Sequence, residues 1–525
     1  MTIGDILTQQ ARERPQLPAL IEARAGGRRR LTFAELEVEV SRAAEWLNGY
    51  GLRQGSAVLV FVPMSVDLYV ALLGMFRVGV VALFVDPSAG RAHLEDCCAR
   101  WKPDALLAIP KAHLLRLRSA ALRSIPRKIV MSGWIPGAVR WLGGSAPIGP
   151  AAKRGDVAES DPALVTFTSG STGRPKAAVR THGFLLAQHR VLAPSIALEP
   201  GEVDLATLPI FTLANLASGV TTVIPDVDLR QPAAVDAEKI LAPIRDFGVT
   251  RITASPALLE RLQARAQRTG GVAPGLRKLY TGGAPVYPKL LDALAAWAPN
   301  ARRVAVYGST EAEPIAHWDA AELSPEERAA MHGGRGLLGG DPVADISLRI
   351  LRDQWGTPRG KMNAAELSGE TLGAGEVGEI VVSGDHVLPG YLGGVGDAET
   401  KFSVDGGVWH RTGDAGLLDE RGRLWLLGRC AAKVEDARGV LYPFAAESVA
   451  MTFPAVKRAA LIAAGGKRLL LVELVEGSAG LLDKIRAATR WAHVDEVKTI
   501  KRLPLDKRHN AKIDYPALRR ELGLE

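Results

Sequence analysis

Helical patterns of apolar residues alternate with short β-rich runs along the first half of the chain. Residues 36–47 carry apolar side chains at helical spacing, which predicts an amphipathic helix. Runs rich in apolar and β-branched residues predict strands at 57–62, 80–85 and 105–109. Because helices and strands alternate, we expect an α/β fold with a largely parallel sheet covered by helices.

The most apolar stretch of the chain runs from Leu68 to Val85. Arg77 lies in its middle, and Asp67 and Asp86 flank it. A charge at mid-membrane costs about 3 kcal/mol or more. We therefore predict a buried helix followed by a buried strand. The N-terminus lacks a basic region followed by an apolar core, so no signal peptide is expected.

Composition narrows the class of protein. A chain of 525 residues is too long for one simple core, and 47% hydrophobic with 23% charged residues is typical of a soluble globular protein. Cys97, Cys98 and Cys430 give no zinc spacing and no disulfide framework, which favours a reducing, cytoplasmic setting. The net charge of +8 suits an anionic substrate. No basic run is interleaved with aromatics, so nucleic-acid binding is not expected.

The pattern changes near Gly428. Short, turn-rich strands precede this point. After it come predicted strands at 459–462 and 468–473 and a helix near 480–491, in a stretch of about 100 residues, which is a small-domain size. We therefore predict two domains, 1–427 and 428–525.

The segment 111–141 combines basic residues with Trp134 and Trp141. Such a segment can be a patch that contacts a membrane surface weakly, for a lipid substrate. It can also be a set of solvated charges on helix faces, and this second interpretation is the more common one.

A hydroxyl-rich and glycine-rich stretch follows an apolar run at 163–167 that predicts a buried strand. Its glycines allow a tight turn with backbone N–H groups close to an anion, and its hydroxyls and lysine suit phosphate oxygens. It is not a Walker loop. A flexible Ser/Gly linker is the alternative. The candidate phosphate-binding residues are Thr168, Ser169, Gly170, Ser171, Thr172, Gly173 and Lys176.

The sequence TSGSTGRPKA at 168–177 resembles the phosphate loop of the adenylate-forming superfamily. That superfamily contains acyl-CoA synthetases, peptide-synthetase adenylation domains and firefly-type luciferases. Ala177 stands where the family usually has glycine. Four further segments match family motifs in order, so the resemblance covers almost the whole chain: 279–285, 306–312, 409–414 with Gly428 and Arg429, and 503–513.

The resemblance implies a fold and a reaction. The fold would have a large N-terminal domain of layered βαβ-type sheets, a distorted β-barrel-like subdomain and a small mobile α+β C-terminal domain. The reaction would be adenylation of a carboxylic acid by ATP with Mg²⁺, giving an acyl adenylate and pyrophosphate. Lys512 would be the catalytic lysine on the mobile domain, and Glu311 would help to hold Mg²⁺.

By the same resemblance, the remaining site residues divide into three groups. Those acting with Lys512 in catalysis would be Thr310, Glu311 and Lys176. Those binding the nucleotide beyond the phosphate loop would be Gly283, Ala284, Pro285, Tyr307, Gly308, Ser309, Asp414 and Arg429. Those lining the acyl pocket would be Phe211, Thr212, Asn215, Gly219 and Gly282, although apolar members such as Phe211 can equally be core.

Several features resemble one branch, the olefin-pathway β-lactone synthetases. The segment 208–219 lacks the histidine that acyl-CoA ligases usually carry, Ala431 occupies the hinge position, and 433–442 is spaced differently from the loop that commonly lines a pantetheine tunnel. The sequence RHNAKI at 508–513 also fits this branch. The resemblance implies a β-hydroxy fatty acid as substrate and the possibility of a partner enzyme of the same pathway. The alternatives are a fatty-acyl-CoA ligase and an acyl-AMP ligase that loads a carrier protein.

Overall fold

A computed structural model of the protein describes residues 2–24, 27–86, 90–143, 156–169, 175–229, 232–477, 480–506 and 511–524. The structure is mixed α/β, and its residues group into two compact units. The first comprises Met1–Asp226 and Leu388–Asp397, and the second comprises Val227–Val387 and Ala398–Glu525. The chain therefore passes from one unit to the other three times.

The described residues of the first unit form a sheet in the order β7-β6-β5-β3-β4-β8-β9. All neighbouring strands are parallel except β9, which is antiparallel to β8. The predicted parallel sheet is thus confirmed. Its strands are β3 Ala57–Phe61, β4 Val81–Phe84, β5 Ala105–Ala108, β6 Arg127–Val130, β7 Val139–Arg140, β8 Pro162–Ser169 and β9 Pro175–Thr181.

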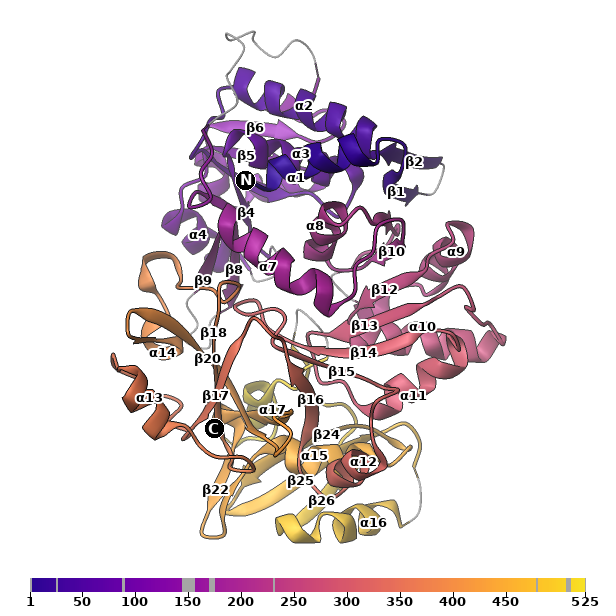
Figure 1. Ribbon diagram of the computed structural model, residues 1–525, viewed down its shortest axis with the longest axis vertical. Helices are drawn as coiled ribbons and strands as arrows, with labels where there is room; N and C mark the ends of the chain where they lie inside the picture. The colour runs from indigo at the N-terminus through magenta and orange to yellow at the C-terminus, as the bar shows by residue number, and fades with distance from the viewer. Residues whose placement is uncertain are drawn as a thin grey trace. The chain divides into compact units, whose positions relative to one another are not determined.

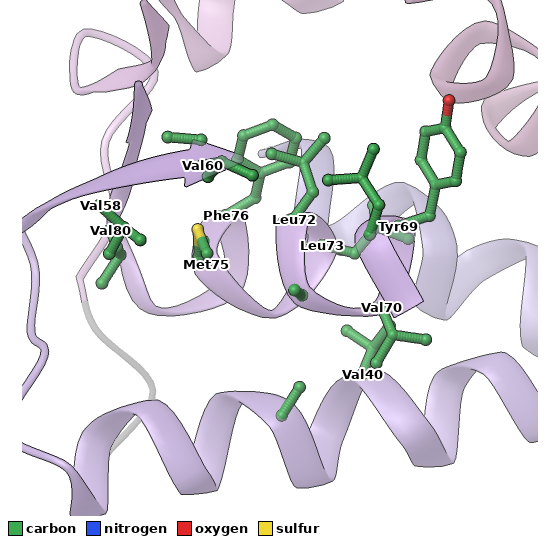
Figure 2. Close-up of a cluster of buried hydrophobic side chains, with 14 of the residues drawn as sticks. Val40, Val58, Val60, Tyr69, Val70, Leu72, Leu73, Met75, Phe76 and Val80 are labelled. Carbon is green, nitrogen blue, oxygen red and sulfur yellow. The ribbon is translucent and has the colours of Figure 1, made fainter. Parts of the chain in front are cut away.

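Helices cover both faces of this sheet. On one face Phe76 and Leu72 of α3 face Val60 of β3, and α2 packs on the other side of α3, where Val70 faces Val40 (Figures 1 and 2). On the other face α4 and α6 pack through Leu94 and other buried side chains. These helices are α2 Phe33–Gly49, α3 Val66–Val78, α4 Arg91–Arg100, α5 Pro110–His113 and α6 Ala120–Ser124.

The apolar stretch 68–85 forms α3 followed by β4, as predicted. Ser65 caps the start of α3 by accepting a hydrogen bond from the backbone N–H of Leu68, and Gly79 ends it in the left-handed conformation. Arg77 pairs with Glu37 of α2 at 2.7 Å, so the charge is neutralised within the fold. Across the described parts of the chain, no helix is both long enough and apolar enough to span a bilayer.

A second, smaller set of strands in the first unit runs in the order β10-β11-β1-β2. Three helices accompany it. The elements are α1 Ile3–Glu13, β1 Pro18–Arg24, β2 Gly27–Thr32, α7 His182–Ser195, β10 Val203–Ala206, α8 Pro209–Ala217 and β11 Thr221–Ile224.

The described part of the second unit contains a mixed sheet in the order β17-β18-β20-β21-β16-β15-β14-β13-β12, with β19 paired to β20. Strands β12, β13 and β14 are parallel, and the remaining pairs are antiparallel. The strands are β12 Arg251–Ala254, β13 Lys278–Gly282, β14 Arg302–Tyr307, β15 Ala316–Asp319, β16 Leu337–Pro342, β17 Ser347–Leu351, β18 Gly378–Ser383, β19 Lys401–Val404, β20 Gly407–Leu418 and β21 Leu424–Arg429. The helices up to β21 are α9 Glu238–Asp246, α10 Pro256–Thr269, α11 Pro288–Trp297, α12 Pro325–His332, α13 Ala364–Glu370 and α14 Asp397–Thr400.

A small α+β domain follows β21. Its elements are β22 Val434–Asp436, β23 Gly439–Leu441, α15 Pro443–Met451, β24 Val456–Ala464, β25 Lys467–Leu474, α16 Leu481–Ala488, β26 Glu496–Thr499 and α17 Tyr515–Glu521. The helix expected near 480–491 ends earlier, at Ala488, because Thr489 leaves helical geometry and a short 3₁₀ turn follows. The boundary at 427/428 stays a prediction.

Candidate active site

The predicted phosphate loop connects two neighbouring antiparallel strands of the first unit. Strand β8 ends at Ser169, β9 begins at Pro175, and Thr168 lies opposite Lys176 in the register. The strand expected at 163–167 is therefore confirmed as part of β8. The predictions for Gly170, Ser171, Thr172 and Gly173 concern positions outside the described residues, as do those for the side chains of Thr168 and Ser169.

Lys176 is the member of this loop whose side chain the structure describes. It is buried, and its ammonium nitrogen lies 5.4 Å from the centre of the Tyr391 ring, a favourable cation–π distance. A methyl group added to Gly396 would lie 2.5 Å from Lys176 Cε, so a larger residue there would require the lysine side chain to move. The peptide N–H of Tyr391 donates to Asp397 Oδ1 at 2.9 Å. The segment Leu388–Asp397 thus fixes the lysine side chain, and the sequence analysis missed this role.

The predicted acyl-pocket residues of the first unit lie on or just after α8. Thr212 and Asn215 are fully buried, and Asn215 donates its amide hydrogens to Asp204 Oδ2 at 2.6 Å and Thr222 Oγ1 at 3.2 Å. These bonds tie α8 to β10 and β11. Gly219 has φ +68°, and an added methyl group there would lie 2.9 Å from Gln10 Oε1. Their contact with an acyl chain stays a prediction.

A small apolar pocket lies against the opposite face of α8. It is bounded by α1, α7 and α8. His189 is a polar residue in its wall, and its Nε2 lies 2.9 Å from Ser218 Oγ. Burial lowers the pKa of His189, which favours the neutral ring. Phe211, Thr212 and Asn215 do not line it. The lining residues are Ile3, Ile6, Leu185, Leu186, Gln188, His189, Leu192, Ile210, Leu213, Ala214 and Ala217.

In the second unit, two parallel strands end in the predicted nucleotide turns. Gly282 ends β13 opposite Val306, and an added methyl group would lie 2.4 Å from the Val306 carbonyl oxygen. Gly283 follows with φ +79°, a conformation that glycine adopts without strain, and Ala284 and Pro285 come next. The glycines therefore let two strands end close together beside the turn.

Strand β14 ends at Tyr307, and a tight turn follows it. Ser309 and Ala312 exchange backbone hydrogen bonds of 2.8 and 3.2 Å, and Ser309 Oγ accepts the peptide N–H of Glu311 at 3.3 Å. Gly308 lies inside this turn. Thr310 and Glu311 are half-buried on it.

Tyr307 and Arg429, which belong to two different motifs, both contact Asp414. The hydroxyl of Tyr307 donates to Asp414 Oδ2 at 2.8 Å, and Arg429 Nε lies 3.2 Å from Asp414 Oδ1. Asp414 and Arg429 are direct partners across β20 and β21. Arg429 also donates to the Thr412 carbonyl oxygen at 3.0 Å. The structure thus brings together residues that the sequence motifs predicted separately.

Glu311 interacts electrostatically with Arg429 and His410. The Asp414 charge raises the pKa of Arg429, with smaller contributions from Tyr307 and Glu311. Burial and the nearby Lys401 lower the pKa of His410 to about 3, while Glu311 opposes that shift. His410 is therefore neutral at ordinary pH. The pKa of Tyr307 is raised by burial and by Asp414, so its hydroxyl remains a donor.

The side chains of this site offer few ligands for Mg²⁺. Within the described ranges, no three His, Cys, Asp or Glu side chains gather closely enough to hold a metal ion by themselves. Mg²⁺ is commonly held by one or two carboxylates together with substrate phosphates. A single half-buried carboxylate such as Glu311 fits an ion that arrives with a nucleotide.

The backbone of Lys512 is hydrogen-bonded to Asp506. Asp506 Oδ1 accepts the peptide N–H of Lys512 at 2.9 Å, and the Lys512 carbonyl oxygen accepts the peptide N–H of Asp506 at 2.9 Å. Leu505 and Ile513 form an antiparallel bridge next to this pair. The backbone of Lys512 is thereby held at a defined point of the small domain.

A buried carboxyl group that the sequence analysis missed anchors the same region. Glu447 on α15 accepts the hydroxyl of Tyr515 at 2.6 Å and the peptide N–H of Leu461 at 2.8 Å. Tyr515 begins α17, three residues after Lys512. Burial raises the pKa of Glu447 to about 7. The available signal was a lone carboxylate within residues 443–451, which are apolar apart from Glu447 and Ser448.

The ribose motif also contains a buried ion pair with a supporting role. Arg411 and Glu379 are both fully buried and pair at 2.7 Å between Nη2 and Oε2. Arg411 further donates to the carbonyl oxygens of Thr357 and Gln354. This arginine fixes β20, and hence Asp414, against β18.

The sequence of this chain matches a known protein family. The family model "AMP-binding enzyme" matches residues 7–392. The chain belongs to this family. It is 33% identical to an olefin β-lactone synthetase of Stenotrophomonas maltophilia over 97% of this chain and 95% of that relative. It is also 33% identical to an olefin β-lactone synthetase of Xanthomonas campestris over 92% of this chain and 89% of that relative.

The fold comparison agrees. The O-succinylbenzoate coenzyme A synthetase of Bacillus subtilis, solved with ATP and magnesium ion, has a TM-score of 0.75 at 22% identity, covering 96% of this chain and 98% of that chain. This AMP-binding enzyme therefore has the adenylate-forming fold, with a large sheet domain and a small C-terminal domain. It is an AMP-forming ligase or synthetase that uses ATP. The predicted superfamily, fold class and enzyme class are confirmed.

Proposed function

We propose that this enzyme adenylates a β-hydroxy fatty acid and then closes the product to a β-lactone. The observation that carries the proposal is the 33% identity, over 97% of the chain, to a relative named olefin β-lactone synthetase. The histidine-free segment 208–219 supports it, because acyl-CoA ligases usually carry a histidine there.

In the first step the substrate carboxylate attacks the α-phosphorus of ATP, and the bond to pyrophosphate breaks. The phosphate loop and Lys176 hold the triphosphate, and Asp414 accepts hydrogen bonds from the ribose hydroxyls. Mg²⁺, bound with Glu311, would neutralise phosphate charge. Lys512, carried on a mobile domain 428–525, stabilises negative charge on the attacking carboxylate and the α-phosphate.

Positioning and electrostatics supply most of the rate in such phosphoryl chemistry. The bonds that hold Lys176, Asp414 and Lys512 in place are consistent with that demand. Buried Lys176 has its stem against Gly396, and the Lys512 backbone is fixed by Asp506. A charged group that is already oriented need not reorganise as the transition state forms.

In the second step the β-hydroxyl oxygen of the same molecule attacks the adenylated carbonyl carbon. The carbon–oxygen bond to AMP breaks, AMP leaves with the electron pair, and the hydroxyl proton is released to solvent. The product is the starting acid less one water. No second substrate takes part, so the high effective molarity of an intramolecular group replaces a bound acceptor.

The test is to identify the product by mass spectrometry. Purified enzyme receives ATP, Mg²⁺ and a β-hydroxy fatty acid, with and without coenzyme A. The matched control is the acid of the same length without the hydroxyl group. We expect AMP and a lactone, independent of coenzyme A, from the hydroxy acid only. A thioester that forms only with coenzyme A would replace this proposal with the acyl-CoA ligase alternative. Pyrophosphate release followed by acyl transfer to a carrier protein would favour the acyl-AMP ligase.

A further inference from the structure

The chain between Pro110 and Gly143 in the first unit is unusually basic. It contains no Asp or Glu. Its cations are Lys111, Arg116, Arg118, Arg123, Arg127, Lys128 and Arg140. The structure folds it into α5, a 3₁₀ turn Leu114–Leu117, α6, β6 and β7, at the edge of the sheet.

Apolar side chains are exposed in the same segment. Among the described residues, Trp134 with 78% exposure and Leu117 with 77% are the two most exposed large apolar side chains, and Leu114 is 57% exposed. The 3₁₀ turn Leu114–Leu117 buries none of its residues. Exposed large apolar groups that gather in one region mark a contact surface.

Hydrogen bonds and helix geometry hold these groups together. In a 3₁₀ helix the residues i and i+3 lie above one another, so Leu114 and Leu117 share one face. Arg116 donates to the carbonyl oxygen of Pro136 at 3.4 Å, which places the Trp134 loop beside that turn. Arg123 donates to the carbonyl oxygens of Arg116 and Leu117 at 3.0 and 3.1 Å. We call Leu114, Leu117 and Trp134, with Lys111, Arg116, Arg118 and Arg123, the basic apolar patch.

One carboxylate lies beside this region: Glu95 Oε1 is 3.5 Å from Ser119 Oγ and pairs with Arg91. Among the parts of the chain that the structure describes, no carboxylate lies within ion-pair distance of the patch cations. Lys128 donates to the Arg123 carbonyl oxygen at 2.9 Å, and partial burial and the Arg116 charge lower the pKa of Lys128. Like charges this close attract an anionic partner.

We propose that the basic apolar patch docks on the surface of an anionic lipid bilayer. Protruding leucines and a tryptophan suit the boundary between headgroups and acyl chains, while surrounding Lys and Arg side chains bind anionic headgroups. Single-stranded nucleic acid is the less suitable partner, because it requires several aromatic rings for base stacking and the patch has one. This inference goes beyond the proposed function. If the substrate is a long-chain acid, the patch brings the enzyme to the phase into which that acid partitions.

The experiment measures binding of the full chain to vesicles by co-sedimentation. One set contains phosphatidylcholine only, and the other also contains phosphatidylglycerol. The apolar variant is Leu114→Ser/Leu117→Ser/Trp134→Ser, and the charge variant is Lys111→Gln/Arg118→Gln. The matched control is Val272→Ser/Val475→Ser, because both valines are exposed outside the patch. Melting temperatures confirm that each variant is folded.

We expect binding to the phosphatidylglycerol vesicles that weakens with added salt. Each patch variant should reduce the apparent vesicle affinity by about tenfold or more, and the control variant should leave it unchanged. The charge variant removes two cations near the anionic surface. The apolar variant removes the side chains that would be buried at the boundary between headgroups and acyl chains. Equal binding of wild type and both patch variants would overturn the proposal. So would equal binding to both vesicle types, or binding to single-stranded RNA that is stronger than vesicle binding and lost in the charge variant. Activity on a short, water-soluble acid should stay unchanged in every variant, so this result is independent of the proposed reaction.

Discussion

The hydroxyl of Tyr515 donates a 2.6 Å hydrogen bond to Glu447, whose carboxyl group is buried inside the small domain. Tyr515 starts α17 and lies three residues after Lys512, and Asp506 Oδ1 accepts the peptide N–H of Lys512. The backbone of Lys512 and the start of α17 are thus held by a half-buried carboxylate, Asp506, and by a buried one, Glu447.

Glu447→Gln should change how stability depends on pH. Burial raises the pKa of Glu447 from 4.5 to about 7, so the folded protein holds a proton that the unfolded chain releases. The stability that this proton contributes is complete below pH 4.5 and is lost as pH rises through 7. The melting temperature of the variant minus that of wild type should therefore be larger at pH 8 than at pH 5.5. Calorimetry at both pH values measures this, and a difference that is constant with pH would contradict it.

Tyr515→Phe should weaken adenylation without removing nucleotide binding. The ring still packs, but Glu447 loses its hydroxyl donor, and the lysine segment loses an anchor. A neutral hydrogen bond contributes roughly 1 kcal/mol, which predicts a several-fold lower kcat in ATP–pyrophosphate exchange. The affinity for ATP, measured by calorimetry, should stay close to wild type. An equal loss in both measurements would assign Tyr515 to binding instead.

Lys512→Ala should abolish adenylation and leave ATP binding largely in place. The ammonium is expected to act on charge that develops in the transition state, so its loss affects kcat more than affinity. Lys501→Ala is the matched control, since Lys501 is an exposed lysine of the same domain. Pyrophosphate release is the measurement. Unchanged release in the Lys512 variant would remove this residue from the catalytic set.

Asp414→Asn should weaken ATP binding. The substitution keeps the side-chain shape but removes the charge that pairs with Arg429 and accepts from Tyr307. Hydrogen bonds to charged groups contribute about 1.5–3 kcal/mol, so we expect a roughly 10- to 100-fold higher Kd for ATP. Calorimetric titration with ATP tests this. Tyr307→Phe keeps the charge and should have a smaller effect, and the reverse order would contradict the ribose role.

Arg411→Ala should destabilise the protein strongly. The change leaves Glu379 buried without its cation, which typically costs about 3–5 kcal/mol. Arg328→Ala is the matched control, because Arg328 pairs with Asp292 at the surface, where such a pair contributes about 1 kcal/mol or less. Thermal melting should separate the two variants clearly. Similar shifts would mean that the Arg411 site relaxes or hydrates when the pair is broken.

The spacing of apolar residues was enough to predict several helices and strands of the first unit. The helix expected at 36–47 lies within α2, because burial of one apolar stripe decides its position and Thr32 and Glu35 form its capping box. The strands at 57–62 and 105–109 appear as β3 and β5. The spacing of apolar residues and the capping residues act over short stretches of chain, so both can be recognised in a single sequence.

Tertiary contacts could not be predicted in the same way. Tyr391 lies beside Lys176 only because the chain returns to the first unit late in the sequence. The meeting of Tyr307 with Asp414 was expected only through family motifs, since no local pattern links residues 107 positions apart. Helical spacing also did not show which face of α8 lies toward a pocket. Residues such as Leu213 line the apolar pocket, and Phe211 and Thr212 do not.

The three crossings of the chain between its units have a consequence for biosynthesis. Strand β9 and the Lys176 side chain need Leu388–Asp397 as a neighbour, and this segment is translated long after Asp226. Domains form from the N-terminus onward as the nascent chain emerges. Here the first unit cannot be completed on the ribosome until residue 397 has emerged, and a recombinant fragment that stops at Asp226 would lack the wall against which its lysine packs.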